Sequence, residues 1–292
     1  MPALNLKDTL TVARFDYRNL VRSAPGVIFL ILYLFIVWQV GAASVDMIPL
    51  GVKKSPTCEL GKDHVATKVE DKVQQNIPPF SNVSTDTWRH MMCDRPVVMS
   101  VFFLIALFIG PPICLLLAFI QVGGYLHRKS IRYILPKTGR LELYLGLFLS
   151  NLKFFTVVSG AVTVIVTLGW ILVGRDLSTI AVLGYSMRIF LALWLSSVPL
   201  IAFMAMVAGL VGSPGWTLLI GGLYYLLSDV IGYFMAKQSE YANVVFYLLP
   251  LNPKYWFAQP GVGPFLGAAV VMLLYTAGYL ALGWVFLRRR NV

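Results

Sequence analysis

Residue types that carry out covalent or metal chemistry are few in this chain and stand far apart. The three histidines, His64, His90 and His127, share no short spacing, and no HExxH or GxSxG motif is present. The phosphate-binding loop GxxxxGK followed by Ser or Thr is also absent, so the chain supplies no Walker-type ATP site by itself. These absences disfavour a metalloenzyme, an intramembrane protease and an ATPase.

A basic cluster is the main polar feature that remains. The stretch from 127 to 153 carries Arg128, Lys129, Arg132, Lys137, Arg140 and Lys153 against one acid, Glu142. Pro136 and Gly139 favour a sharp bend in its middle. Two interpretations stay open: a rigid docking element for a soluble partner, or a basic flank that only orients the neighbouring membrane spans.

The composition predicts a bilayer as the surrounding solvent. The chain is 58% hydrophobic and 13% charged, and a helix of about 20 apolar residues crosses the hydrocarbon. We expect an all-α polytopic membrane protein, because helices satisfy their own backbone groups in lipid. The six expected transmembrane segments are 27–45, 97–126, 154–173, 189–211, 214–236 and 262–287.

The positions of the short basic flanks predict the orientation. Six spans place three basic segments on one side, namely 1–24, 127–145 and Arg288 to Arg290. We expect this side to be the cytoplasm, with both termini there. The loop 46–95 carries seven bases and seven acids and is expected outside, as is the hairpin 237–261. The net charge of +11 is therefore a topology signal, and we expect no nucleic-acid partner. The predicted location is the cell membrane, in multi-pass form.

The first 24 residues predict an amphipathic helix. Leu6, Leu10, Ala13, Tyr17 and Leu20 recur with helical spacing. Lys7, Arg14, Arg18 and Arg22 lie on a neighbouring face, toward the anionic headgroups of a bilayer. This helix is either a plain membrane-flanking helix or an elbow that packs beside a partner subunit.

Two of the three cysteines, Cys58 and Cys93, lie in the loop 46–95. Outside the cytoplasm they either form a disulfide, worth about 3–4 kcal/mol for a loop of this length, or remain free thiols. Cys114 falls within the second span and is expected to pack. No metal site is predicted, because the spacing typical of zinc ligands is absent.

Two charged residues at or within the spans remain. Asp229 is costly in hydrocarbon unless it is paired or hydrated, so it marks either a subunit interface or substrate path, or a position near water at the outer end of its span. Arg188 precedes the fourth span and is expected to extend toward the outer interface.

The order of these features resembles a permease of the ABC-2-type exporter superfamily, with the type V ABC exporter fold. The stretch ILPKTGRLELYLGLFLSN, with Pro136, Arg140 and Gly146, is similar to the cytoplasmic signature of that family. VARFDYRNLVRS resembles its N-terminal elbow, LPLNPKYWFAQP its outer re-entrant hairpin, and WVFLRRRNV its C-terminal end. The similarity covers nearly the whole chain except 46–95.

The resemblance implies one half of a membrane path, completed by a second copy, identical or related. Separate ATP-binding subunits, which hold the ATP and Mg, would dock from the cytoplasm, and 127–145 would be the coupling helix. The residues implied in docking are Arg128, Lys129, Arg132, Pro136, Arg140 and Glu142. The chain itself would not be catalytic, and the exported substrate is unidentified.

Two other classes of function remain open. In one, the chain belongs to an ABC-type complex that transmits ATPase motion to an outer partner through 46–95 and transports nothing. In the other, it is a stand-alone carrier or channel. Few intramembrane charges and the lack of an evident inverted repeat argue against an ion-coupled carrier.

Overall fold

Every regular element in the described parts of the chain is helical, and these parts contain no strand. The computed structural model describes residues 5–47, 87, 91, 99–107, 110, 112–116, 138–173, 179–238 and 252–289. The helices are α1 (Leu6–Arg22), α2 (Ala24–Met47), α8 (Arg140–Val173), α9 (Thr179–Val211), α10 (Pro214–Gln238) and α12 (Gly263–Arg289), with the 3-10 helix η2 (Asn252–Phe257). The expectation of an all-α protein is confirmed for these residues.

Three helices, α8, α9 and α12, are each long and apolar enough to cross a membrane. A fourth span is reached if the bent pair α1 and α2 counts as one. The chain is therefore a membrane protein, while the expected number of six spans remains a prediction. The expected second span, 97–126, is described only in short helical pieces, and the expected fifth span corresponds to α10.

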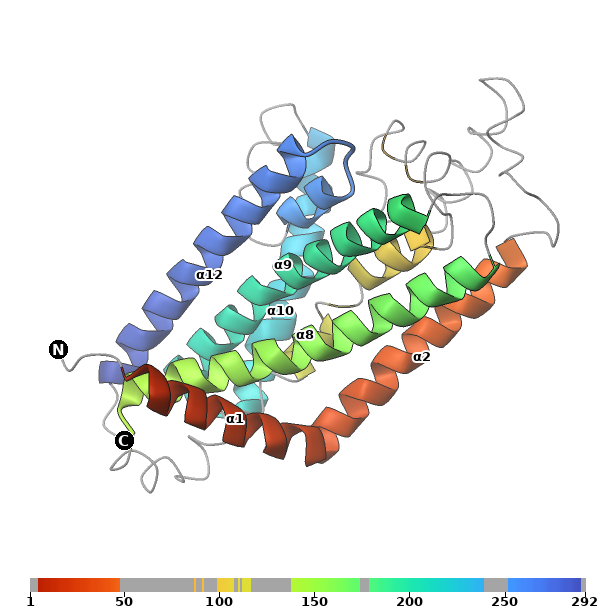
Figure 1. Ribbon diagram of the computed structural model, residues 1–292. Coiled ribbons are helices and arrows are strands. Elements are labelled where there is room, and N and C mark those ends of the chain that lie inside the picture. The colour runs from red at the N-terminus through yellow and green to blue at the C-terminus, as the bar shows by residue number, and fades with distance from the viewer. Residues whose placement is uncertain are drawn as a thin grey trace.

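The helix α9 lies at the centre of the bundle. It packs against α8, α10, α12 and η2, and Figure 1 shows α8 beside it with α12 on its other side. From Ala192 to Ala205 nearly every side chain of α9 is buried, as expected for a helix that is apolar on all its faces. The helical pieces between 99 and 116 join the same core, including Cys114, which is buried as a free thiol and so packs as expected.

The amphipathic helix α1 packs across the first half of α8. Of the face predicted from the sequence, Ala13 and Leu20 are buried, whereas Leu6 and Leu10 are 63% and 55% exposed. The buried face is Thr9, Ala13, Asp16 and Leu20. The contact face is thus rotated from the predicted one, and an exposed apolar strip lies between it and the exposed bases.

A sharp bend of 64° separates α1 from the first part of α2. Ser23 joins the two helices: its hydroxyl donates to the carbonyl of Leu20 at 2.7 Å and accepts the N–H of Gly26 at 3.2 Å. A Cβ at Gly26 would collide with the carbonyl oxygen of Leu20, so the bend requires glycine there.

The helix α8 is longer than the span predicted from its sequence. It has 34 residues, which at about 1.5 Å each is roughly 50 Å, against about 30 Å of hydrocarbon. The expected span 154–173 is its second half. Its first half, 140–153, is the end of the basic stretch, so the bend expected near Pro136 and Gly139 lies before a continuous helix that includes 140–145.

Candidate docking site at the shared end of α1, α8 and α12

The start of α8 is organised around the carboxylate of Glu142. Gly139 directly precedes the helix, and Glu142 is its third residue. The side chain folds back toward the helix start, where a Cβ at position 139 would overlap the carboxylate. A carboxylate in the first turn is stabilised by the partial positive charge of the helix N-terminus. Gly139 therefore leaves the space that lets Glu142 lie against its own helix end.

The same carboxylate also holds the start of α1. Its Oε1 accepts the backbone N–H of Asn5 at 3.3 Å, across 137 positions of sequence. Asn5 is the N-cap of α1, and its Oδ1 accepts the N–H of Lys7 at 3.2 Å. One buried carboxylate thus serves the N-termini of two helices, both of which favour negative charge.

One turn further along α8, Gly146 is the point of closest approach to α1. A Cβ at this position would lie 2.7 Å from Cγ1 of Val12, 2.8 Å from its Cβ and 3.0 Å from the carbonyl oxygen of Thr9. The two helix backbones meet this closely because no side chain stands between them. Gly146 is therefore a packing residue for α1.

Another face of the first turns of α8 packs against α9 and α12. A second hydrophobic cluster joins the three helices through Leu143, Tyr144, Leu147, Ala205, Ala208 and Leu287. Gly283 of α12 lies against the Tyr144 ring, and a Cβ there would collide with the phenol and approach Cα of Met206 to 2.9 Å. The start of α8 is thus enclosed by α1 on one side and by α9 and α12 on the other.

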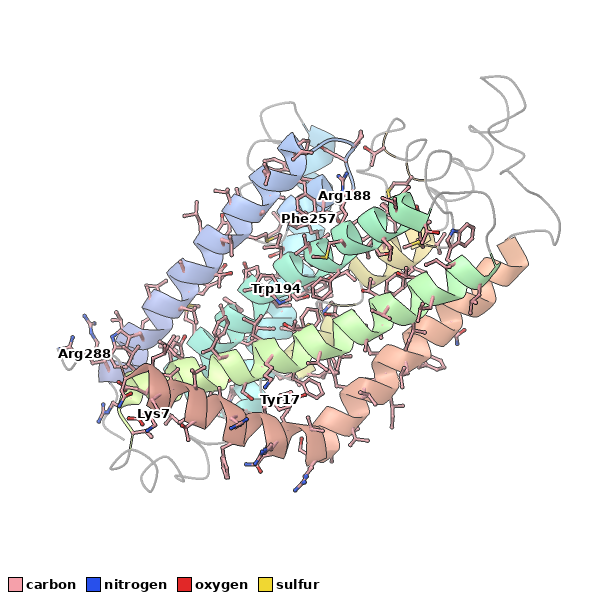
Figure 2. The ribbon with its side chains drawn as sticks, viewed as in Figure 1. Lys7, Tyr17, Arg188, Trp194, Phe257 and Arg288 are labelled. Carbon is pink, nitrogen blue, oxygen red and sulfur yellow. The ribbon has the colours of Figure 1, made fainter. Side chains whose placement is uncertain are left out.

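The end of α12 is tied to this site through Arg140. Its guanidinium donates to the backbone carbonyl of Arg288 at 3.3 Å. A cation is favourable at a helix C-terminus, where the last carbonyls lack helical partners. The starts of α1 and α8 and the end of α12 therefore meet at one end of the bundle, as the labels of Lys7 and Arg288 in Figure 2 indicate.

The surface at this shared end is basic. The exposed cations at this end are Lys7 of α1 and Arg288 and Arg289 of α12, and the half-buried Arg140 of α8 contacts the end of α12. Charge of one sign on a rigid surface attracts acidic partners and raises their association rate. Its bases come from three helices that are far apart in the sequence.

Of the six predicted docking residues, the structure brings Arg140 and Glu142 to this end. The other four, Arg128, Lys129, Arg132 and Pro136, lie outside the described residues, as do Cys58 and Cys93. Asp229 lies within α10, and only its backbone is described. Across the described ranges, no group of three or more His, Cys, Asp or Glu side chains is placed to hold a metal ion.

Sequence reasoning missed the role of Arg188 at the other end of the bundle. Its Nη2 lies within 3.4 Å of the backbone carbonyl oxygens of Phe257, Gln259 and Gly261, and its guanidinium lies over the ring of Phe265 at 5.5 Å. Figure 2 shows it beside Phe257. These contacts fasten the segment after η2 to α9, and the expected position of the side chain at the outer interface remains a prediction.

A buried cation in η2 was also not anticipated. Lys254 is only 1% exposed, and its Nζ lies 3.5 Å from the hydroxyl of Tyr225 on α10. The ammonium also lies over the rings of Tyr225 and Tyr255, at 5.0 and 5.4 Å from their centroids. A lysine in an aromatic run gave no signal that it would be buried, because burial depends on α10.

The shared end of α1, α8 and α12 is therefore a basic surface that is joined to three helices. Its chemistry is electrostatic: the groups described there are bases, a buried carboxylate and backbone dipoles.

A comparison of the chain with protein-family models and with curated proteins finds no match.

Proposed function

We propose that this chain is the permease subunit of an ABC-2-type exporter. In this proposal six spans form half of a membrane path, α1 is the elbow helix, and 127–145 is the cytoplasmic coupling element. A second copy completes the path. Separate subunits bind ATP and Mg and hydrolyse the nucleotide, and the energy of that step drives export of a substrate that remains to be identified.

The observation that carries the proposal is the junction at Glu142. A coupling element must pass a displacement to the spans without deforming, and α8 continues from this junction as one helix of 34 residues. The hydrogen bond from Asn5 and the close contact at Gly146 join α1 to the same piece. A push on the basic segment before α8 would therefore move α1 and α8 together.

The contacts of Arg140 extend this piece to α12, through the carbonyl of Arg288. The second cluster of buried side chains adds α9. ATP binding in the partner can shift the permease between two states only if the partner contacts differ between those states. A basic surface fixed to three helices provides contacts that would change when those helices tilt.

The test is purification of the tagged chain from its native membrane, followed by measurement of Mg-dependent ATPase activity in the purified complex. The proposal expects a co-purifying ATPase. Joint reversal of Arg132 and Arg140 to Glu is expected to remove most of that activity from the complex, and each single reversal much less, because exposed charge pairs contribute about 0.2–1 kcal/mol each. Reversal of Arg22, an exposed base at the far end of α1, is the matched control.

Three results bear against the proposal. Absence of any co-purifying ATPase from the unaltered chain contradicts it. Full retention of the ATPase by the double variant removes the docking role of the two arginines. Failure of the double variant to insert, measured by protease protection of its loops, supports the alternative that these bases only set orientation.

A further inference from the structure

An apolar groove with one charged residue lies on the surface between α8 and α9. Its volume is about 460 Å³, and it is largely open to the surroundings. It is lined by Leu149, Leu152, Lys153, Thr156 and Val157 of α8 and by Phe190, Leu191 and Trp194 of α9. Lys153 is exposed, and it is the one cation among these lining residues.

The polar groups inside the groove are already satisfied. The hydroxyl of Thr156 donates to the carbonyl of Leu152 at 2.6 Å and accepts the indole N–H of Trp194 at 2.8 Å. With these atoms paired, the groove offers an occupant hydrocarbon contact along its length. An aliphatic chain fits this lining, and a polar solute would lose hydrogen bonds to water without replacement.

Lys153 stands where α8 would enter the hydrocarbon. It lies 13 residues after Arg140, or roughly 20 Å along the helix, and the 20 residues from there to Val173 suffice to cross the bilayer. At the same level α1 crosses α8: the ring of Tyr17 lies 6.3 Å from that of Phe154, and the Lys153 ammonium lies 4.7 Å from the Tyr17 centroid. Figure 2 shows Tyr17 and Trp194 near this part of α8.

The part of α1 that crosses α8 here carries more positive than negative charge: Arg14 and Arg18 are exposed, and the acid between them, Asp16, is buried. Within the described part of the chain, the Tyr17 ring is the one recorded partner of the Lys153 ammonium, and no carboxylate pairs with it. An anionic group at the height of the headgroups would complement these three cations, whereas a choline group would be repelled by them.

We infer that this groove binds one anionic phospholipid, with an acyl chain between α8 and α9 and the phosphate beside Lys153. The inference requires only that the chain lies in a membrane, and it does not depend on the proposed ATPase partner. A basic residue near an anionic membrane surface contributes about 1 kcal/mol, which corresponds to about a fivefold preference for phosphatidylglycerol over phosphatidylcholine.

The test uses quenching of Trp194 fluorescence by brominated acyl chains, which requires contact. The full chain is placed in phosphatidylcholine nanodiscs that contain a minor fraction of brominated phosphatidylglycerol or, in parallel, brominated phosphatidylcholine. The signal of Trp194 is the difference between the unaltered chain and Trp194→Phe. We expect about fivefold stronger apparent binding of the brominated phosphatidylglycerol, and loss of this preference in Lys153→Gln.

Arg289→Gln is the matched control, because it removes an exposed base from the end of α12, away from the groove. Circular dichroism and size-exclusion profiles verify that each variant is folded. Equal quenching of Trp194 by the two lipids would mean unselective solvation and would overturn the inference. So would a preference that survives in Lys153→Gln, or protection of Trp194 from both lipids, which would indicate that protein covers the groove.

Discussion

The carboxylate of Glu142 accepts the backbone N–H of Asn5 at 3.3 Å, and this bond joins the starts of α8 and α1. Both residues stand at helix N-termini, so the carboxylate neutralises two partial positive charges at once. Because Glu142 is only 7% exposed, water competes weakly for these contacts. The junction should therefore be stable while the exposed bases around it remain available to a partner.

Removal of the carboxylate should loosen the start of α1. We expect Glu142→Ala to destabilise the protein by about 1–3 kcal/mol, since hydrogen bonds to charged groups contribute this much. Glu142→Gln keeps an acceptor and should cost less. Hydrogen exchange would show faster exchange in the first turn of α1 in both variants, with α12 unchanged. Unaltered exchange in α1 would show that other contacts alone hold the helix.

A methyl group at Gly146 should separate α1 from α8. We expect Gly146→Ala to cost about 1–3 kcal/mol, the usual range for overpacking, because the added carbon meets Val12 and the carbonyl of Thr9. Gly169→Ala in the same helix is the control, since its Cβ meets nothing within 4 Å. Val12→Ala should rescue Gly146→Ala only in part, because the backbone contact remains. Thermal unfolding in detergent compares the unaltered chain with the two glycine variants and the double variant. Equal effects at 146 and 169 would refute the close approach.

The phenol of Tyr144 is buried, and its hydroxyl has no hydrogen-bond partner among the described residues. Tyr144→Phe should therefore be neutral or stabilise the protein by about 1 kcal/mol, as an unpaired buried polar group is removed. It should also lessen the cost of Gly283→Ala, whose added carbon collides with that hydroxyl. Gly278→Ala, with open space around it, is the control in α12. A destabilised Tyr144→Phe would reveal a partner for the hydroxyl.

Loss of the Arg188 guanidinium should free the segment after η2. In Arg188→Ala three backbone carbonyls and the Phe265 ring lose their cation, so the segment should open and expose Lys254. We expect trypsin to cleave after Lys254 in this variant and far more slowly in the unaltered chain, where that lysine is buried. Arg188→Lys should be intermediate, because it keeps the charge but is shorter and lacks the planar group that lies over the Phe265 ring. Mass spectrometry of the fragments shows whether the chain is cut after Lys254. Identical cleavage in all three proteins would show that Arg188 does not hold this segment in place.

The predicted orientation can be tested with single cysteines. Thr138, just before α8, and Ser84, in the loop 46–95, should label from opposite sides of the membrane with an impermeant thiol reagent. The native cysteines are replaced first, and a reagent that crosses membranes serves as the control for reactivity. Labelling of both positions from outside would exclude the expected topology.

The sequence alone determined the class of protein and the content of its helices. Apolar runs near and above 20 residues can satisfy their backbone only as helices in lipid, so α8, α9 and α12 were predictable from composition and length. The amphipathic α1 was predictable because helical spacing of apolar residues and neighbouring bases is a local property. The buried cysteine at 114 followed from the same apolar pattern.

The tertiary structure decided which of these residues meet. The buried face of α1 uses Thr9 and Asp16 in place of Leu6 and Leu10, because the smooth surface of α8 at Gly146 accepts a closely packed backbone. Contacts across such distances in sequence depend on crossing angles and on the space left by glycines, and neither is encoded in a local period. For the same reason, the bond from Asn5 to Glu142 exists only once α1 lies on α8.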